Sequence, residues 1–224
     1  MLLLLSCSDY DLASPVGPEV ERKDSGSPAV AVDDTAPPRD TAAVDTAFDP
    51  PADTGDYVVD DCQDGYFAYY YNLPADHPDV EIEDAGGPDD VPSNHDWWDE
   101  AYYAFEQEDP GLEFGDQWWP VNTGLPGDPQ YFAVRWVAIL ESDSDLIVPF
   151  EMGSDDDSWA YLDGELMASL PGIHGVEATQ FYAPLTQGQH KLELFMAERH
   201  TSNSGFWFKW LAEGVRIFAC PDGA

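Results

Sequence analysis

Basic side chains are scarce in this chain: 8 Lys and Arg stand against 45 Asp and Glu in 224 residues, a formal net charge of −37. A protein that binds nucleic acid through its phosphates needs clustered Lys and Arg. Attraction to an anionic membrane surface needs the same charges. Both are therefore excluded as direct partners. Eight Trp and an aromatic content of 13% argue against wholesale disorder, so part of the chain has a hydrophobic core.

Recognisable catalytic signatures are also missing. The sequence has no Gly-x-Ser-x-Gly nucleophile elbow, no His-Glu-x-x-His zinc helix and no phosphate-binding loop. Its five His residues are scattered without the spacing of a zinc site. They are His77, His95, His174, His190 and His200. We therefore expect this chain not to be an enzyme.

The amino terminus, residues 1–7, reads Met-Leu-Leu-Leu-Leu-Ser-Cys. It is too short for a complete secretion signal and has no positive region before the leucines. The stretch from Leu4 to Cys7 resembles the lipobox of bacterial lipoproteins, in which the Cys becomes the lipidated first residue. This resemblance implies a truncated signal, caused by a start codon placed too far downstream, and an exported protein anchored in the cell envelope by lipid at Cys7. The alternative is a chance run of Leu before an unrelated Cys.

Cysteine is rare as well, and the three present are Cys7, Cys62 and Cys220. An odd number leaves one thiol to explain in an exported protein. If Cys7 carries lipid, Cys62 and Cys220 can pair and close the aromatic-rich region into one loop. In the chain-entropy model such a bond contributes about 5 kcal/mol, and it points to an oxidising compartment. The alternative is two unrelated buried thiols.

Residues 8–61 are dominated by Pro, Ala, Asp, Thr and Gly and show no apolar periodicity. The tripeptide Asp-Thr-Ala recurs at 34–36, 40–42 and 45–47. Like-charged segments that contain Pro stay extended. We therefore predict a disordered acidic tether over 8–61 and a short tail over 221–224.

Residues 62–220 have the pattern of an all-β protein. Leu192, Leu194 and Met196 alternate with Lys191 and Glu193, as in a half-buried strand. Turn signals such as Asp163-Gly164 separate such segments. The expected strands are 66–72, 131–140, 146–152, 158–162, 165–169, 176–182, 190–196, 205–211 and 215–220. They predict a two-sheet antiparallel β-sandwich, with a loop-rich stretch at 74–130 that includes one short helical turn near 97–105.

Three consecutive carboxylates, Asp155, Asp156 and Asp157, stand directly before one expected strand. Adjacent like charges repel one another, so a folded domain that keeps them together usually supplies a cation. Oxygen ligands suit a hard divalent ion, above all calcium. The alternative is a solvated acidic loop.

The order of three segments resembles the PA14 domain. They are Gly-Tyr-Phe-Ala-Tyr-Tyr-Tyr at 65–71, Tyr-Phe-Ala-Val-Arg-Trp at 131–136, and Ser-Asp-Asp-Asp-Ser-Trp-Ala-Tyr-Leu-Asp-Gly at 154–164. Pro-Gly-Ile-His at 171–174 and Leu-Phe-Met-Ala-Glu-Arg-His-Thr at 194–201 are similar to the fibro-slime variant of that family. The resemblance covers nearly all of 62–220 and implies a β-sandwich, in agreement with the strand pattern.

Carbohydrate-binding members of the PA14 family hold calcium with two neighbouring Asp residues joined by a cis peptide, and the ion ligates sugar hydroxyls. By position this metal pair falls on Asp155 and Asp156. Neighbouring side chains of a regular strand point to opposite faces, which is why the link must be cis. Asp157, Trp159 and His174 are expected to contact the ligand, with the two rings stacking on a sugar.

The match departs from the fibro-slime pattern at one position. Those sequences have Ser-Asn-Phe where this chain has Ser204-Gly205-Phe206, so Asn203 must serve if an Asn completes the site. Glu198, Arg199 and His200 either help to complete it or are structural, since Arg199 beside acids is typical of a buried ion pair.

Together these features predict an exported, cell-surface, calcium-binding module whose partner is a carbohydrate or a glycan-bearing surface, as in a lectin or adhesin. One alternative is a structural surface or matrix protein that uses calcium only for rigidity. A remote alternative is a glycoside hydrolase. Its two carboxylates would face each other across a bond, about 5 to 9.5 Å apart, which suits adjacent residues poorly.

Overall fold

The computed structural model describes residues 57–82, 87, 89–121, 128–210 and 212–221. The predicted lipobox at 1–7 with Cys7, the predicted tether up to residue 56 and most of the predicted tail at 221–224 therefore lie outside the described residues. The helices within those ranges are two single 3₁₀ turns, η1 at Pro92–Asn94 and η2 at Glu100–Tyr102. Neither they nor any other described segment forms an apolar helix of membrane-spanning length.

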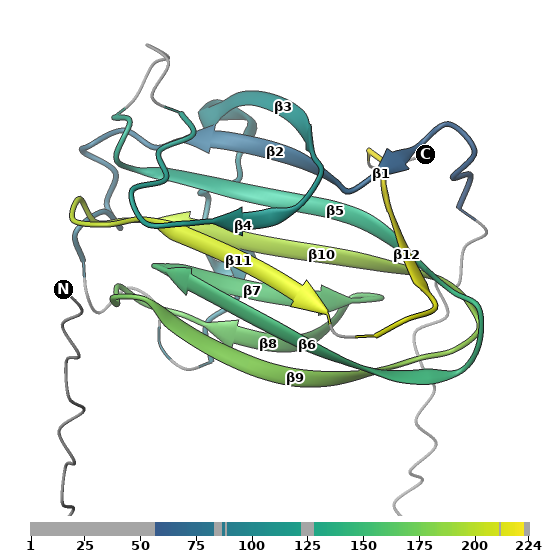
Figure 1. The fold of residues 1–224 in the computed structure, drawn as a ribbon. Helices are drawn as coiled ribbons and strands as arrows, with labels where there is room; N and C mark the ends of the chain where they lie inside the picture. The colour runs from purple at the N-terminus through teal and green to yellow at the C-terminus, as the bar shows by residue number, and fades with distance from the viewer. Residues whose placement is uncertain (1–56, 83–86, 88, 122–127, 211, 222–224) are drawn as a thin grey trace, which may run out of the picture. The chain divides into compact units, whose positions relative to one another are not determined.

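Two antiparallel sheets build the domain, which confirms the predicted all-β sandwich (Figure 1). In the described ranges the larger sheet has the order β1-β12-β5-β10-β7-β8, with β2 and β3 joined to it through β5, and the smaller sheet has the order β4-β11-β6-β9. The strands are β1 Gln63–Asp64, β2 Tyr66–Asn72, β3 Tyr103–Asp109, β4 Leu112–Phe114, β5 Phe132–Ser142, β6 Leu146–Asp155, β7 Asp157–Leu162, β8 Glu165–Leu170, β9 Glu177–Leu185, β10 Gly188–Glu198, β11 Gly205–Trp210 and β12 Val215–Ala219.

Strand β5 organises the larger sheet. On one edge it pairs with β10 along its whole length, from Phe132 opposite Glu198 to Ser142 opposite Gly188. On the other edge β2 covers its first half and β12 its second half. β5 therefore has neighbours on both edges, and its almost continuous apolar sequence lies buried on both faces of the sheet.

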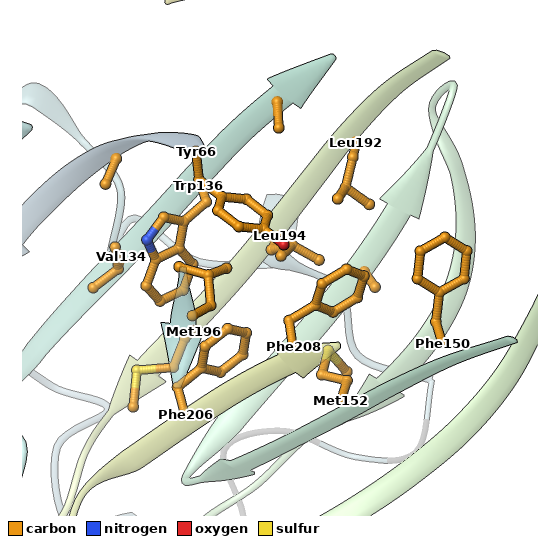
Figure 2. Close-up of a cluster of buried hydrophobic side chains, with 14 of the residues drawn as sticks. Tyr66, Val134, Trp136, Phe150, Met152, Leu192, Leu194, Met196, Phe206 and Phe208 are labelled. Atoms are coloured by element: carbon orange, nitrogen blue, oxygen red, sulfur yellow. The ribbon is translucent and has the colours of Figure 1, made fainter. Parts of the chain in front are cut away.

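The core between the sheets comes from the predicted alternation (Figure 2). Leu192, Leu194 and Met196 of β10 point toward Phe206 and Phe208 of β11 in the opposite sheet. All five side chains are buried. Burial of this apolar area is the main favourable term that holds the two sheets together.

A second apolar cluster covers the outer face of the larger sheet. Trp97, Val80 and Leu73 come from the 74–102 region or its edge, and they pack with Trp159 of β7 and Ala133 of β5. The segment between β2 and β3 is therefore a packed cover for one side of the sheet. It includes η2, which is the short helical turn expected near residues 97–105.

Each of the nine expected strands is present, with boundaries within three residues of the prediction. The far end of the expected strand 205–211 falls on residue 211, outside the described residues. Strands β1, β3 and β4 are additional. β3 and β4 lie within 74–130 and correct the expectation that this stretch contains loops and one helical turn but no strand. β3 was not predicted because its sequence, Tyr-Ala-Phe-Glu-Gln-Glu-Asp, lies at a sheet edge with mostly exposed side chains.

Cys62 and Cys220 form a disulfide, with their Cα atoms 5.3 Å apart and a separation of 158 positions in sequence. The predicted pairing is therefore confirmed. β1 and β12 pair directly beside it, with Gln63 opposite Ala219. The bond joins the two ends of the domain.

Candidate cation-binding site

The chain passes from one sheet to the other at the three consecutive aspartates. β6 of the smaller sheet ends at Asp155, β7 of the larger sheet begins at Asp157, and Asp156 lies between them. The Asp155–Asp156 peptide bond is cis, as the resemblance implies. All three side chains are buried rather than solvated.

Glu198 brings a third carboxylate to the first two. It is the last residue of β10, whose preceding residue Ala197 pairs with Asp157 of β7. One oxygen each from Asp155, Asp156 and Glu198 lies within 4.8 Å of the others. Glu198 Oε1 accepts a hydrogen bond from the His200 amide at 3.0 Å, whereas Oε2 is buried without a hydrogen-bond partner.

The electrostatics of these three groups favour a cation. Burial raises the pKa of Asp156 to about 6 and raises the pKa of Asp155. For Glu198, burial and then the charge of Asp156 raise the pKa well above its usual range. Each shift means that the ionised form is disfavoured where it stands. A metal ion reverses this, and these acidic groups can hold one.

Asp156 also fixes neighbouring backbone. Its Oδ1 accepts a hydrogen bond from the His174 amide at 3.0 Å, and its Oδ2 accepts one from the Arg199 amide at 3.1 Å. The carboxylate thus connects the β6–β7 link, the loop after β8 and the end of β10.

Arg199 and Asp157 form a separate ion pair in the interior. Both side chains have an exposed fraction of 0%, and Nε lies 2.8 Å from Asp157 Oδ2. Nη1 donates to the carbonyl oxygens of Asp79 and Ile82 at 3.0 and 2.9 Å, and the guanidinium lies 5.0 Å from the centre of the Trp97 ring. This is the structural role that the sequence left open for Arg199.

A pocket of about 290 Å³ opens over the first two carboxylates. Its lining residues are Asp155, Asp156, Ile173, His174, Gly175, His200, Ser202 and Asn203. Ser202 and Asn203 are exposed and form its rim, whereas the aspartates lie at its buried base. The site is therefore accessible from solvent.

The pocket brings together three of the remaining expected residues. The His174 ring lies against the Gly175 carbonyl oxygen at 2.9 Å, and Asn203 Oδ1 accepts a hydrogen bond from Gln117 at 2.6 Å. His200 also lines this pocket. Gly205, which stands where fibro-slime sequences have Asn, is the strand partner of Asp155, and Asn203 lines the pocket from two residues earlier in the chain.

Two expected ligand contacts are corrected by the structure. Asp157 is held by Arg199 and by the Gly172 amide, and Trp159 is fully buried, with Nε1 donating to the Asp90 carbonyl at 2.8 Å. Neither lines the pocket. Both point to the outer face of β7, which the segment between β2 and β3 covers.

Sequence reasoning also missed the pocket residues Ile173, Gly175 and Ser202. They lie in loops without apolar periodicity, and the Pro-Gly-Ile-His motif at 171–174 pointed to His174 rather than to Ile173. Glu198 was named, but its place as the third carboxylate depends on the pairing of β10 with β7. The signal that could have found it is the alternation of β10, which continues to residue 198.

No family model matches this sequence, and no curated protein matches it either. Solved structures do resemble the fold. The PA14 domain of the antifreeze protein MpAFP has 12% identity and a TM-score of 0.53, over 71% of this chain and 88% of that one. The PA14 sugar-binding domain of an RTX adhesin has 16% identity and a TM-score of 0.52, over 67% and 91%.

The A domain of epithelial adhesin 9 from Candida glabrata, in complex with Galb1-4GlcNAc, has 12% identity and a TM-score of 0.51, over 72% of this chain and 92% of that one. The match to an anti-sigma factor domain-containing protein from Clostridium clariflavum, with 14% identity and a TM-score of 0.50, covers 72% of this chain and only 49% of that protein. Identities this low establish the architecture alone. By its fold, the described domain is a PA14-like β-sandwich.

Proposed function

We propose that Asp155, Asp156 and Glu198 hold one calcium ion, and that the open face of this ion binds the hydroxyl groups of a carbohydrate. The observation that carries the proposal is the convergence of three buried carboxylates beneath a solvent-accessible pocket. The unpartnered Glu198 Oε2 supports it, because a buried acceptor of this kind requires a donor or a cation.

Calcium suits this set better than other common ions. The three ligands are all oxygens, and calcium takes six to eight oxygens in flexible geometry. Three carboxylates leave positions open toward the pocket, where water or vicinal hydroxyls can complete the coordination. Since Trp159 is buried, apolar contact with a sugar ring falls to Ile173 and to the rings of His174 and His200.

The structural neighbours support the ligand class. One is a sugar-binding domain of an adhesin, and another was solved with a bound disaccharide. The disulfide supports export to an oxidising compartment. We propose a location at the cell surface, with lipid at Cys7 as the anchor and 8–61 as the tether.

A scaffold that uses calcium only for rigidity is the second candidate. It is favoured by the bonds of Asp156 to the His174 and Arg199 amides, because an ion there would fix three chain segments. This candidate predicts calcium binding without any saccharide ligand.

A glycan array separates the two candidates. We expect the purified protein to bind a restricted set of glycans in calcium and to lose these signals in chelator. The variant Asn203→Ala removes a rim side chain that lies outside the three carboxylates, so it is expected to weaken glycan binding while calcium still raises the melting temperature. A silent array with an intact calcium-dependent melting shift would favour the scaffold, and hydrolysis of any saccharide would contradict both candidates.

A further inference from the structure

A second group of metal-ligating side chains lies in the segment between β2 and β3. Ligand atoms of His77, Asp79 and Asp96 lie within 4.8 Å of one another. His77 Nε2 is 3.0 Å from Asp96 Oδ1. The His77 side chain is fully buried, whereas Asp96 is 54% exposed, so the group opens to solvent on the Asp96 side. None of these residues lines the pocket over Asp155 and Asp156.

Neighbouring side chains orient the ligands of this second group. Asp79 Oδ2 accepts a hydrogen bond from Trp97 Nε1 at 2.8 Å and lies 3.3 Å from His95 Nδ1. His95 in turn stacks on Trp97, with ring centres 3.7 Å apart, and its Nε2 lies 2.5 Å from Asp90 Oδ2. Both contacts to Asp79 end on Oδ2. Outer contacts of this type fix metal ligands in place.

We propose that His77, Asp79 and Asp96 form a second metal site, which takes a borderline divalent transition ion such as Zn²⁺. One imidazole nitrogen with two carboxylate oxygens suits zinc and related ions, whereas calcium prefers oxygen ligands alone. Water completes the coordination on the exposed side.

Loading this site rearranges one proton. His77 Nδ1 accepts a hydrogen bond from the Asp79 amide at 3.2 Å, so the neutral ring carries its proton on Nε2, toward Asp96. Zinc at Nε2 would displace this proton to Nδ1, and two hydrogen bonds would be given up: Nε2–H to Asp96 Oδ1 at 3.0 Å and the Asp79 amide to Nδ1 at 3.2 Å. The protein would exchange these two hydrogen bonds for three metal bonds.

The surrounding charge also favours a cation. The Tyr102 ring packs against His77 with centres 5.4 Å apart. Asp76, Asp79, Asp96 and Asp99 all belong to the same segment as this ring. A bound cation would offset part of their mutual repulsion.

Zinc titration in excess calcium tests this proposal on the full chain. The excess calcium fills the first site. In a parallel titration Co²⁺ replaces zinc, and its quenching of Trp fluorescence reports on binding near Trp97, which contacts Asp79. We expect one zinc ion to bind in wild type. Asp96→Asn should weaken binding by at least about tenfold, and His77→Gln should abolish it. Asp99→Asn is the matched control, because this exposed aspartate carries the same charge in the same segment and makes no side-chain cap bond.

Three outcomes would overturn the second site. One is the absence of saturable zinc binding in wild type. Another is equal zinc affinity in Asp96→Asn and Asp99→Asn. This comparison remains informative even if His77→Gln fails to fold because the side chain at position 77 is buried. The third is loss of zinc binding in Glu198→Gln while Asp96→Asn binds normally, since this result would place zinc in the first site.

Discussion

Replacement of Arg199 by Met is expected to destabilise the domain by about 3–5 kcal/mol. The guanidinium is fully buried and bonds the Asp157 carboxylate and the carbonyls of Asp79 and Ile82. Met fills a similar volume but leaves the Asp157 charge uncompensated in the interior, and it releases the segment that covers the outer face of the larger sheet. Urea denaturation at neutral pH measures this loss.

Arg216 provides the matched control for Arg199. It also pairs with a carboxylate, that of Glu141, at 2.5 Å and also lies over an aromatic ring, that of Phe218, but its side chain is 61% exposed. Arg216→Met should cost about 1 kcal/mol or less. Adding Asp157→Asn to Arg199→Met should recover part of the stability, because it removes the unpaired charge. Equal losses for Arg199→Met and Arg216→Met would show that the buried pair has no special role.

Removal of the disulfide is expected to cost up to about 5 kcal/mol, the chain-entropy value for a loop of this length. Cys62 and Cys220 are 158 positions apart and enclose every strand from β1 to β12, so the reduced chain gains far more conformational freedom on unfolding than the disulfide-bonded chain does. The measurement is the midpoint of urea unfolding for the double variant Cys62→Ser/Cys220→Ser, compared with wild type in a Cys7→Ser background.

The Cys7→Ser background keeps a third thiol from exchanging with the disulfide. Reductant added to the parent should reproduce the double variant, and reductant added to the double variant should change nothing. An unchanged midpoint on reduction would mean that contacts such as the pairing of β1 with β12 already hold the ends together.

Strands were predictable from the sequence where a single residue pattern is enough to mark them. β10 shows its alternation plainly, because one of its faces meets Phe206 and Phe208 in the core. β3 was not predictable, because an exposed edge strand has no apolar pattern. Three consecutive aspartates indicated a cation site, and the resemblance to the PA14 domain assigned the proposed metal pair to Asp155 and Asp156.

The two wrong predictions of ligand contacts at the site have one physical cause. Asp157 and Trp159 occupy alternate positions of β7 on its outer face, and exposure of that face depends on whether another segment covers it. Trp97, some 60 residues earlier in sequence, packs on Trp159 with ring centres 6.3 Å apart and turns an expected ligand contact into core. Likewise His77 and Asp96 show no metal spacing in sequence, because two separate turns bring them together.

The most direct test of the account is a calorimetric titration of calcium into the chelated protein and its variants. We predict a single calcium ion in wild type, loss of binding in Asp156→Asn and in Glu198→Gln, and unchanged binding in Asp143→Asn, an exposed aspartate in the turn before β6, the strand that carries Asp155 at its other end. The Glu198 variant is decisive, because only the converging geometry assigns that residue to the ion. Calcium affinity that survives both Asp156→Asn and Glu198→Gln would contradict the central claim.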